Sequence, residues 1–292
     1  MDIRFLESLV AVIDTGSIAA AARRQNLTAA AVSQRIQTLE RQLRCPLLSR
    51  HSHAAQATEA CLALLPRMRI LIRDAQALAG DLDTSGLSGD LRIGAISTAL
   101  TGILPPALGR LTHQAPQLRL RITPGPSDRL YESVLAGELD GAVLVAPPFA
   151  VPKSLTMIEL RRERLVLISA APLGAMTTDE ALATMPYIRY DPHAWGGRIA
   201  ERYIDERRLQ PEIFCDLDGL EAIAVLVARG MGNSLVPAWA GFETVGLNVT
   251  MLPDDEAYHR QIVFLQASVP SRPNALALLA DVLSTLQVDA AV

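Results

Sequence analysis

The chain has 292 residues, half of them hydrophobic, and a net charge of −4. This is enough apolar sequence for two or three domains and excludes a nucleic-acid-binding protein that is basic throughout. The charge is uneven, however, because residues 1–73 hold ten arginines and five acidic residues, whereas the remainder holds 17 basic and 26 acidic residues. A basic N-terminal part on an acidic body predicts a polyanionic partner for that end only.

The cysteines and the hydropathy pattern concern the cell compartment. Cys45, Cys61 and Cys215 are odd in number and form no C-x-x-C pair, which favours a reducing compartment. No apolar run reaches the roughly 18 residues that a membrane span requires, and the N-terminus lacks the pattern of a signal peptide. We therefore expect a cytoplasmic protein without a membrane partner.

The first 43 residues predict three short helices. An amphipathic helix over 2–14 is followed by a second that Ser17 caps and that runs to about Gln25. Thr28 caps the third, which runs from Ala29 to about Leu43. Two helices joined by a tight turn are typical of a helix-turn-helix, whose second helix lies in the DNA major groove. A plain helical bundle is the alternative, and the basic bias favours DNA binding.

A helix that reads a groove presents small or polar side chains from its first turns, and arginines beside it can bind phosphate. The segment after Pro46 adds two short extended pieces around a polar tip, which is typical of a wing. The candidate DNA-binding residues are Ser17, Thr28, Ala29, Ala30, Ser33, Gln34, Arg35, Gln37, Arg50 and His53.

A longer helix follows Thr58 and extends to about residue 80, with apolar residues on two faces and Pro66 inside the run. Proline should bend this helix or lie near its first turn. A helix with two apolar faces has two neighbours, and we expect the N-terminal domain on one face and a second copy of the chain on the other. Residues 83–91 are small, polar and glycine-containing, which indicates a hinge.

The rest of the chain alternates strands and helices, which predicts an α/β domain with parallel sheets. The expected strands are 91–97, 118–124, 139–146, 164–170 and 260–268, with a last helix at about 272–286. We expect the domains 1–58 for DNA binding, 59–86 for the linker helix and hinge, and 87–292 for effector binding. The effector-binding part is expected to form subdomain I (87–162 and 267–292) and subdomain II (163–266).

Ligands of open α/β sheets bind beyond the carboxyl ends of the strands. Ser97 and Thr98 lie at such a strand–helix junction and suit an anion, although either could simply cap the helix. Arg189, beside Tyr190, could pair with an anionic effector, or it could form a solvated charge or a structural ion pair. Ser127, Ala146 and Asp218 flank the same cleft by position, and Asp218 could instead cap the following helix.

Motifs of catalysis and metal binding are absent from the sequence, which has no H-E-x-x-H, no zinc spacing, no G-x-S-x-G and no phosphate loop. We therefore predict no catalytic residue, no metal and no cofactor. Two other classes of protein stay open at this point: a solute-binding module, or an α/β enzyme with a basic helical extension.

Several motifs together resemble the LysR-type transcriptional regulators along essentially the whole chain. They include Gly16-Ser17, Leu27-Thr28, Thr58-Glu59-Ala60 and above all AVSQRIQTLE at 31–40, followed by GDLRIG, GELDGAV and GMGNSLVP in the second part. The resemblance implies a winged helix-turn-helix and a linker helix that pairs protomers into a homodimer or homotetramer. It also implies a two-subdomain effector-binding domain similar to periplasmic solute-binding proteins.

Members of this family bind double-stranded operator DNA and respond to a small-molecule effector, and RNA polymerase is a further candidate partner. Five residues depart from the family pattern: Arg44 and Cys61 each replace a usual glycine, Leu48 replaces a usual phenylalanine, and Ala29 and His53 differ at positions that bear on DNA. Ala29 stands where the family usually has a base-contacting glutamine, and His53 lies near a usual wing arginine. These departures bear on the operator sequence and leave the fold expectation unchanged.

Overall fold

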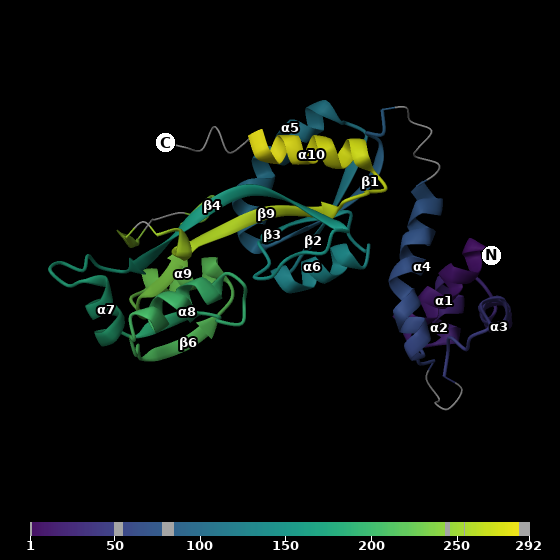
Figure 1. Ribbon diagram of the computed structural model, residues 1–292, viewed down its shortest axis with the longest axis horizontal. Coiled ribbons are helices and arrows are strands. Elements are labelled where there is room, and N and C mark those ends of the chain that lie inside the picture. Colours follow the sequence, from purple (N-terminus) through teal and green to yellow (C-terminus); the bar gives the residue numbers. More distant parts are fainter. Residues whose placement is uncertain (1, 50–54, 78–84, 243–245, 254, 286–292) are drawn as a thin grey trace. The chain divides into compact units, whose positions relative to one another are not determined.

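The computed structural model describes residues 2–49, 55–77, 85–242, 246–253 and 255–285. The chain divides into two compact units, residues 1–86 with 135–138 and residues 87–134 with 139–292, and Figure 1 labels their elements.

The first unit contains the three predicted short helices. They are α1 (Ile3–Thr15), α2 (Ile18–Arg24) and α3 (Ala29–Leu43). The predicted caps are confirmed, because Ser17 accepts a hydrogen bond from the Ala20 amide and Thr28 accepts one from the Ala31 amide. Gly16 ends α1 with φ +66°, a conformation that glycine adopts without a steric penalty. Leu48 and Ala57 form an antiparallel bridge at the base of the predicted wing.

One apolar core joins these helices. Leu9 and Val12 of α1 are buried against Val32 and Leu39 of α3. Ala21 of α2 is also fully buried there, and its small side chain lets the helices approach closely. The spacing of the apolar residues therefore gives α3 one buried face and leaves the opposite face to solvent.

The fourth helix, α4 (Glu59–Ala77), begins as predicted, with Thr58 accepting a hydrogen bond from the Cys61 amide. Pro66 lies well inside the helix and not in its first turn. Cys61 and Met68 are buried in the core of the first unit, whereas Leu64 and Leu71 are exposed. The predicted extension to residue 80 lies outside the described residues.

The second unit contains a seven-stranded sheet in the order β2-β1-β3-β9-β4-β7, with β8 also paired to β4. Its strands are β1 (Gly89–Ala95), β2 (Leu118–Pro124), β3 (Gly141–Val145), β4 (Leu155–Ser169), β7 (Ser234–Pro237), β8 (Asn248–Met251) and β9 (His259–Ala267). A separate pair consists of β5 (Tyr187–Tyr190) and β6 (Ile213–Leu217). β1 begins at Gly89, inside the segment predicted as a hinge.

The prediction of parallel sheets is only partly right. β1 is parallel to β2 and β3, and β5 is parallel to β6. However, β9 runs antiparallel to both β3 and β4, and β4 runs antiparallel to β7 and β8. The chain passes directly from β3 into β4 and returns through β9, so these pairings need no crossover helix and strand–helix alternation does not reveal them.

Helices cover the sheets in two groups. The first group is a short π-helix η1 (Ala99–Ile103) with α5 (Leu104–Gln114), α6 (Ser127–Leu135) and α10 (Pro273–Thr285). In Figure 1, α5 and α10 lie on the opposite side of the sheet from α6. The second group is α7 (Thr178–Thr184), α8 (Gly197–Glu206) and α9 (Leu220–Ala228), with a 3-10 turn η2 (Glu256–Tyr258).

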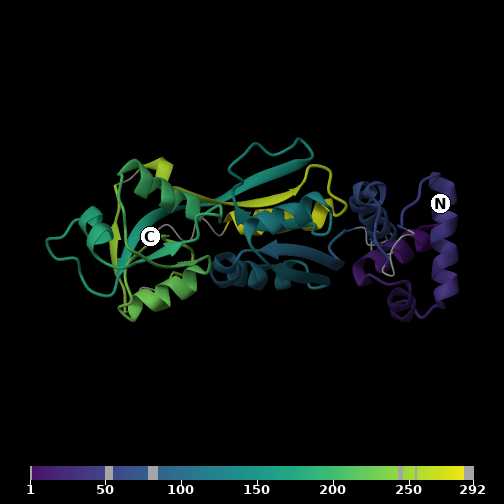
Figure 2. The same ribbon diagram turned by 90° about the horizontal axis from the view of Figure 1, so that it is seen from below.

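Two long strands, β4 and β9, connect the two groups of helices (Figures 1 and 2). They pair with each other from Leu155–Ala267 to Arg164–His259, with a register shift between Glu159 and Arg161. The subdomain boundaries that we expected at 162/163 and 266/267 therefore fall within these strands.

The length and composition of the helices bear on membrane spanning. No single described helix is both long and apolar enough to cross a bilayer, and α1 with α2 passes only as a pair that is bent by 119°.

Candidate DNA-binding and effector-binding sites

The outer face of α3 carries most of the residues predicted to read DNA. Thr28, Ala29, Ala30, Gln34 and Gln37 are exposed, and Ser33 is partly exposed. The buried positions of α3 hold this face outward, since Val32, Ile36 and Leu39 fill the core behind it. The face presents small residues in the first turn and two amides beyond it, which can donate to and accept from base edges.

Arg35 has a structural contact that we did not predict. Its Nη1 donates a 3.1 Å hydrogen bond to Oγ of Ser8, a fully buried residue of α1. The same Oγ lies 2.9 Å from Oε1 of Gln25, which follows α2. Arg35, Ser8 and Gln25 therefore join the three helices, and Arg35 is turned toward α1.

Glu40 supports the segment after α3. Its Oε1 accepts hydrogen bonds from the backbone amides of Leu47 (2.7 Å) and Leu48 (3.2 Å). These contacts hold the start of the wing against α3. Arg50 and His53, which we predicted to contact DNA from the wing, lie outside the described residues.

In the second unit, a cavity of about 510 Å³ opens at the carboxyl ends of β1, β2, β3, β5 and β6. Five of the predicted effector-binding residues line it: Ser97, Thr98, Ser127, Tyr190 and Asp218. They come from segments that lie beside both groups of helices, so the cavity lies between the two subdomains. Its position agrees with the general rule that ligands of open α/β sheets bind beyond the strand ends.

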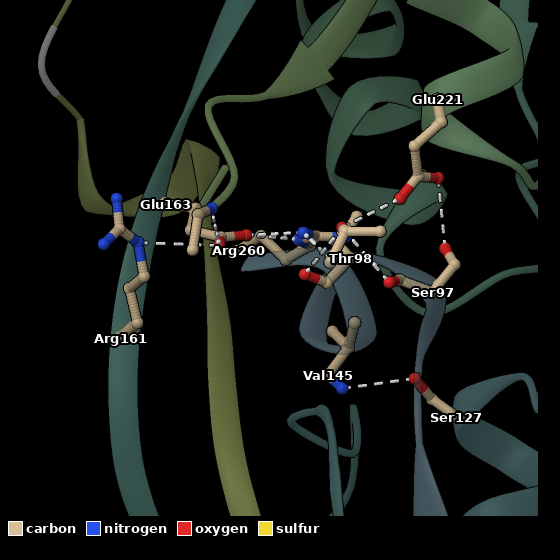
Figure 3. A network of polar contacts seen from close by, with 10 residues as sticks. Ser97, Thr98, Ser127, Val145, Arg161, Glu163, Glu221 and Arg260 are labelled. Atoms are coloured by element: carbon tan, nitrogen blue, oxygen red, sulfur yellow. Dashed lines mark hydrogen bonds and ion pairs between the residues drawn. The ribbon is translucent and has the colours of Figure 1, made fainter. Parts of the chain in front are cut away.

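Arg260 lines this cavity and forms a buried ion pair with Glu163 (Figure 3). Arg260, at the start of β9, is 2% exposed, and its Nε lies 2.8 Å from Oε2 of Glu163 on β4. Its Nη2 donates a 3.2 Å hydrogen bond to Oγ1 of Thr98. Burial opposes the charge of Arg260, but Glu163 and Tyr190 together outweigh the burial, and the pKa of Arg260 stays above its ordinary value. Thr98 is thus bound to a buried cation and does not cap η1.

Ser97 makes a contact across the cavity mouth. Its hydroxyl donates a 3.3 Å hydrogen bond to Oε2 of Glu221 in α9, and Thr101 donates to Oε1 of the same carboxylate at 3.4 Å (Figure 3). Ser127 contacts the backbone instead, and its Oγ accepts a 3.1 Å hydrogen bond from the Val145 amide at the end of β3. Each serine therefore has a protein partner in this structure.

Two predicted residues are not brought to the cavity. Arg189 points to the neighbouring strand, where its Nε lies 2.7 Å from Oδ1 of Asp216, and its Nη1 lies 3.6 Å from Glu201. The structural ion pair that we weighed as the alternative is what the structure shows. Ala146 lies one residue beyond Val145, which does line the cavity, and Ala146 itself packs against the apolar core.

Comparisons with known proteins identify the family. Residues 3–62 match the model of the bacterial regulatory helix-turn-helix protein, lysR family, and residues 84–287 match the LysR substrate binding domain. The chain belongs to the LysR-type transcriptional regulators. The LysR-type assignment makes this chain a DNA-binding regulator with an effector-binding domain, as the resemblance implied.

Relatives and solved structures agree with this assignment. The transcriptional activator IlvY of Salmonella typhimurium is 29% identical over 244 residues, 81% of this chain and 82% of the relative. The regulator CzcR of Bacillus cereus is 29% identical over 238 residues, 81% of this chain and 80% of the relative. ArgP from Mycobacterium tuberculosis has a similar fold, with a TM-score of 0.74, 20% identity and coverage of 98% of this chain and 97% of that one.

CbnR in complex with its target DNA is also similar in fold, with a TM-score of 0.66 and 20% identity over 98% of this chain and 99% of that chain. The LysR-type fold is therefore shared along the whole described chain.

Sequence reasoning missed the residues of this LysR-type protein whose partners are distant in sequence. Glu163, Arg260, Glu221 and Trp195 belong to the cavity or its rim, and we predicted none of them. Trp195 packs edge-on against Tyr131 and Phe149, with ring centroids 5.9 and 5.6 Å away. A signal existed for Trp195, because it is one of only two tryptophans and precedes two glycines in a loop.

Proposed function

We propose that this regulator reads operator DNA with the outer face of α3 and responds to a small molecule held in the cavity between its subdomains. The observation that carries the DNA-reading part is the pair Gln34 and Gln37, which are exposed on a helix whose opposite face is buried. Side-chain amides can make bidentate hydrogen bonds to adenine. Ala29 can contribute only a methyl contact, so the amides carry the polar readout.

The test is binding of the full-length protein to its own promoter fragments and to random DNA over a series of salt concentrations. We expect Gln34→Ala and Gln37→Ala each to cost about 1–3 kcal/mol of specific binding and to leave non-specific binding unchanged. Gln42→Ala is the matched control, because Gln42 is exposed on the last turn of α3. Equal affinity of the wild type for both kinds of DNA would contradict the proposal, since it would indicate a basic surface alone.

The proposal includes pairing of protomers through α4. Leu64 and Leu71 are seven residues apart and 36% and 40% exposed, so they form an apolar seam beside the face that packs on the first unit. We expect Leu64→Glu with Leu71→Glu to lower the oligomeric state in sedimentation velocity. A double variant that sediments as the wild type does would rule out this seam.

Effector binding acts by shifting a population of conformations, because a ligand that touches both subdomains favours the arrangement in which both can reach it. We propose that the protein works in the cytoplasm, where its DNA lies, and has no catalytic activity. The support for the absence of catalysis is the match to a family of transcriptional regulators.

A further inference from the structure

The residues that line the cavity carry more negative than positive charge. Asp128, Asp191 and Asp218 line it, whereas Arg260 is the only arginine or lysine among the lining residues. The charge of Arg260 is already matched by Glu163, whose side chain is 1% exposed. Within the part of the chain that the structure describes, no arginine or lysine forms an ion pair with any of the three aspartates. The lining also contains one histidine, His193, so the expectation of an anionic effector has no free arginine or lysine in the lining to support it.

The three aspartates approach the cavity from different elements. Asp128 lies in the first turn of α6, Asp191 follows β5, and Asp218 follows β6. Oδ1 of Asp128 accepts a hydrogen bond from the Arg129 amide, and Oδ1 of Asp191 accepts one from the His193 amide, both at 2.8 Å. These bonds fix two of the carboxylates and leave their other oxygens available to a ligand.

The aspartates also act on one another. Burial, followed by the charges of Asp191 and Asp128, raises the pKa of Asp218 above its ordinary value. Asp218 is accessible to water inside the cavity, yet enough protein surrounds it to disfavour its charge. A cation placed among these groups would relieve the repulsion.

The lining and the volume of the cavity favour an organic cation. Among the described residues, no group of three or more His, Cys, Asp or Glu side chains is arranged to hold a metal ion. Apolar residues line the same space, namely Ile96, Leu100, Val145 and Leu220. A volume of about 510 Å³ is of the size that encloses a small organic ligand.

We infer that the effector carries a protonated amine, which lies among Asp128, Asp191 and Asp218, and a short apolar part that packs on the aliphatic lining. This inference rests on the proposed function, in which the cavity is the effector site. Independent support for a ligand comes from the family match, because the cavity lies within residues 84–287, which match a substrate-binding domain. The aspartates then decide the charge of that ligand.

The first experiment uses matched sets of three compounds on the full-length protein. Each set contains a common amino acid, the amine formed by removing its carboxyl group, and the acid formed by removing its amino group. We expect thermal unfolding to shift upward with amino acids or amines and not with the amine-free acids. Calorimetric titration of the best compound should show at least tenfold weaker binding to Asp218→Asn and to Asp191→Asn. Asp205→Asn is the matched control, because Asp205 is exposed on α8 and does not line the cavity.

A second experiment needs no ligand. Asp218→Asn removes one of three neighbouring like charges, so the unliganded variant should unfold at a higher temperature than the wild type, and Asp205→Asn should not. An amine-free acid that binds the wild type, and binds Asp218→Asn more tightly, would overturn the inference and leave the proposed function intact. If no compound of either charge binds, the proposed effector site itself fails.

Discussion

The DNA-binding unit and the effector domain each hold an arginine against a hydroxyl group, but the two contacts differ in charge and in reach. Arg35 donates to Ser8, 27 residues away, and the neighbouring Gln25 is uncharged. Arg260 donates to Thr98, 162 residues away, and is neutralised by Glu163, 97 residues away. The first contact joins helices that are close in sequence, whereas the second joins the two halves of a domain that must respond to a ligand.

The two units therefore differ in how much stability they lose when such a contact is removed. A hydrogen bond contributes about 0.5–1.5 kcal/mol net, or about 1.5–3 kcal/mol when one group is charged, so the DNA-binding unit can lose the bond from Arg35 to Ser8 and still depend on its apolar core. A buried ion pair is different, because removing one partner leaves an uncompensated charge in the protein interior. Removing the carboxylate of Glu163 and the hydroxyl of Ser8 tests this contrast directly.

Glu163→Gln should have the largest effect. It leaves Arg260 buried without its carboxylate, and we expect a loss of about 3–5 kcal/mol in the stability of the effector domain. Both tryptophans of the chain, Trp195 and Trp239, lie in this domain, so their fluorescence during urea unfolding follows it. Glu132→Gln is the control, because its partner Arg129 is 74% exposed and such pairs contribute about 0–1 kcal/mol. Equal losses of unfolding free energy in the two variants would show that the buried ion pair contributes no more to stability than the exposed one.

Gly102→Ala should cause the second largest loss of stability. A Cβ at Gly102 in η1 would lie 1.8 Å from the backbone oxygen of Ala240, so the elements on either side would have to separate. We expect a loss of about 1–3 kcal/mol in the same urea experiment. Gly109→Ala, on the exposed side of α5 with no atom within 4 Å, should instead stabilise by up to about 1 kcal/mol. If the two alanine variants change the free energy of unfolding by the same amount, the expected clash with Ala240 is contradicted.

Ser8→Ala should lower the stability less than Glu163→Gln or Gly102→Ala does. It removes the hydroxyl that accepts from Arg35, and it leaves the amide of Gln25 without this partner. We expect a loss on the order of 1–2 kcal/mol in the DNA-binding unit, measured as loss of helical circular dichroism during urea unfolding. Ser33→Ala, a serine substitution on α3, should leave that midpoint unchanged or raise it slightly. A loss above that of Glu163→Gln would reverse the proposed order of the two networks.

Cys61 gives the smallest expected effect. Burial raises the pKa of its thiol to about 11, so the folded state holds the neutral form at pH 8. Because the folded pKa exceeds the unfolded one, the neutral thiol favours folding below about pH 9, and this contribution is lost between about pH 9 and 11. Cys45 and Cys215 are partly exposed and should react first with a thiol reagent at pH 8. Equally fast labelling of all three would contradict the burial of Cys61.

The parts that the sequence predicted well depend on neighbours a few residues away. Ser17 and Thr28 cap helices because their partners are three residues downstream, and Ser97 and Thr98 line the cavity because they directly follow a strand. Arg189 stayed open between an effector contact and an ion pair because its partner, Asp216, lies on the adjacent strand 27 residues later. Arg260 and Glu163 were missed for the same reason, since the antiparallel pairing of β9 with β4 decides that they meet.

The register shift between β4 and β9 bears on how ligand binding in the cavity would change the rest of the domain. It lies at Glu159–Arg161, immediately before Glu163, so the irregular pairing and the ion pair occupy one stretch of the same strand. An extra residue in one strand increases local twist and bends that strand. Because β4 and β9 connect the two groups of helices, a rotation of one group against the other would bend this ribbon, and Glu163 is the buried carboxylate of β4 next to the irregular pairing.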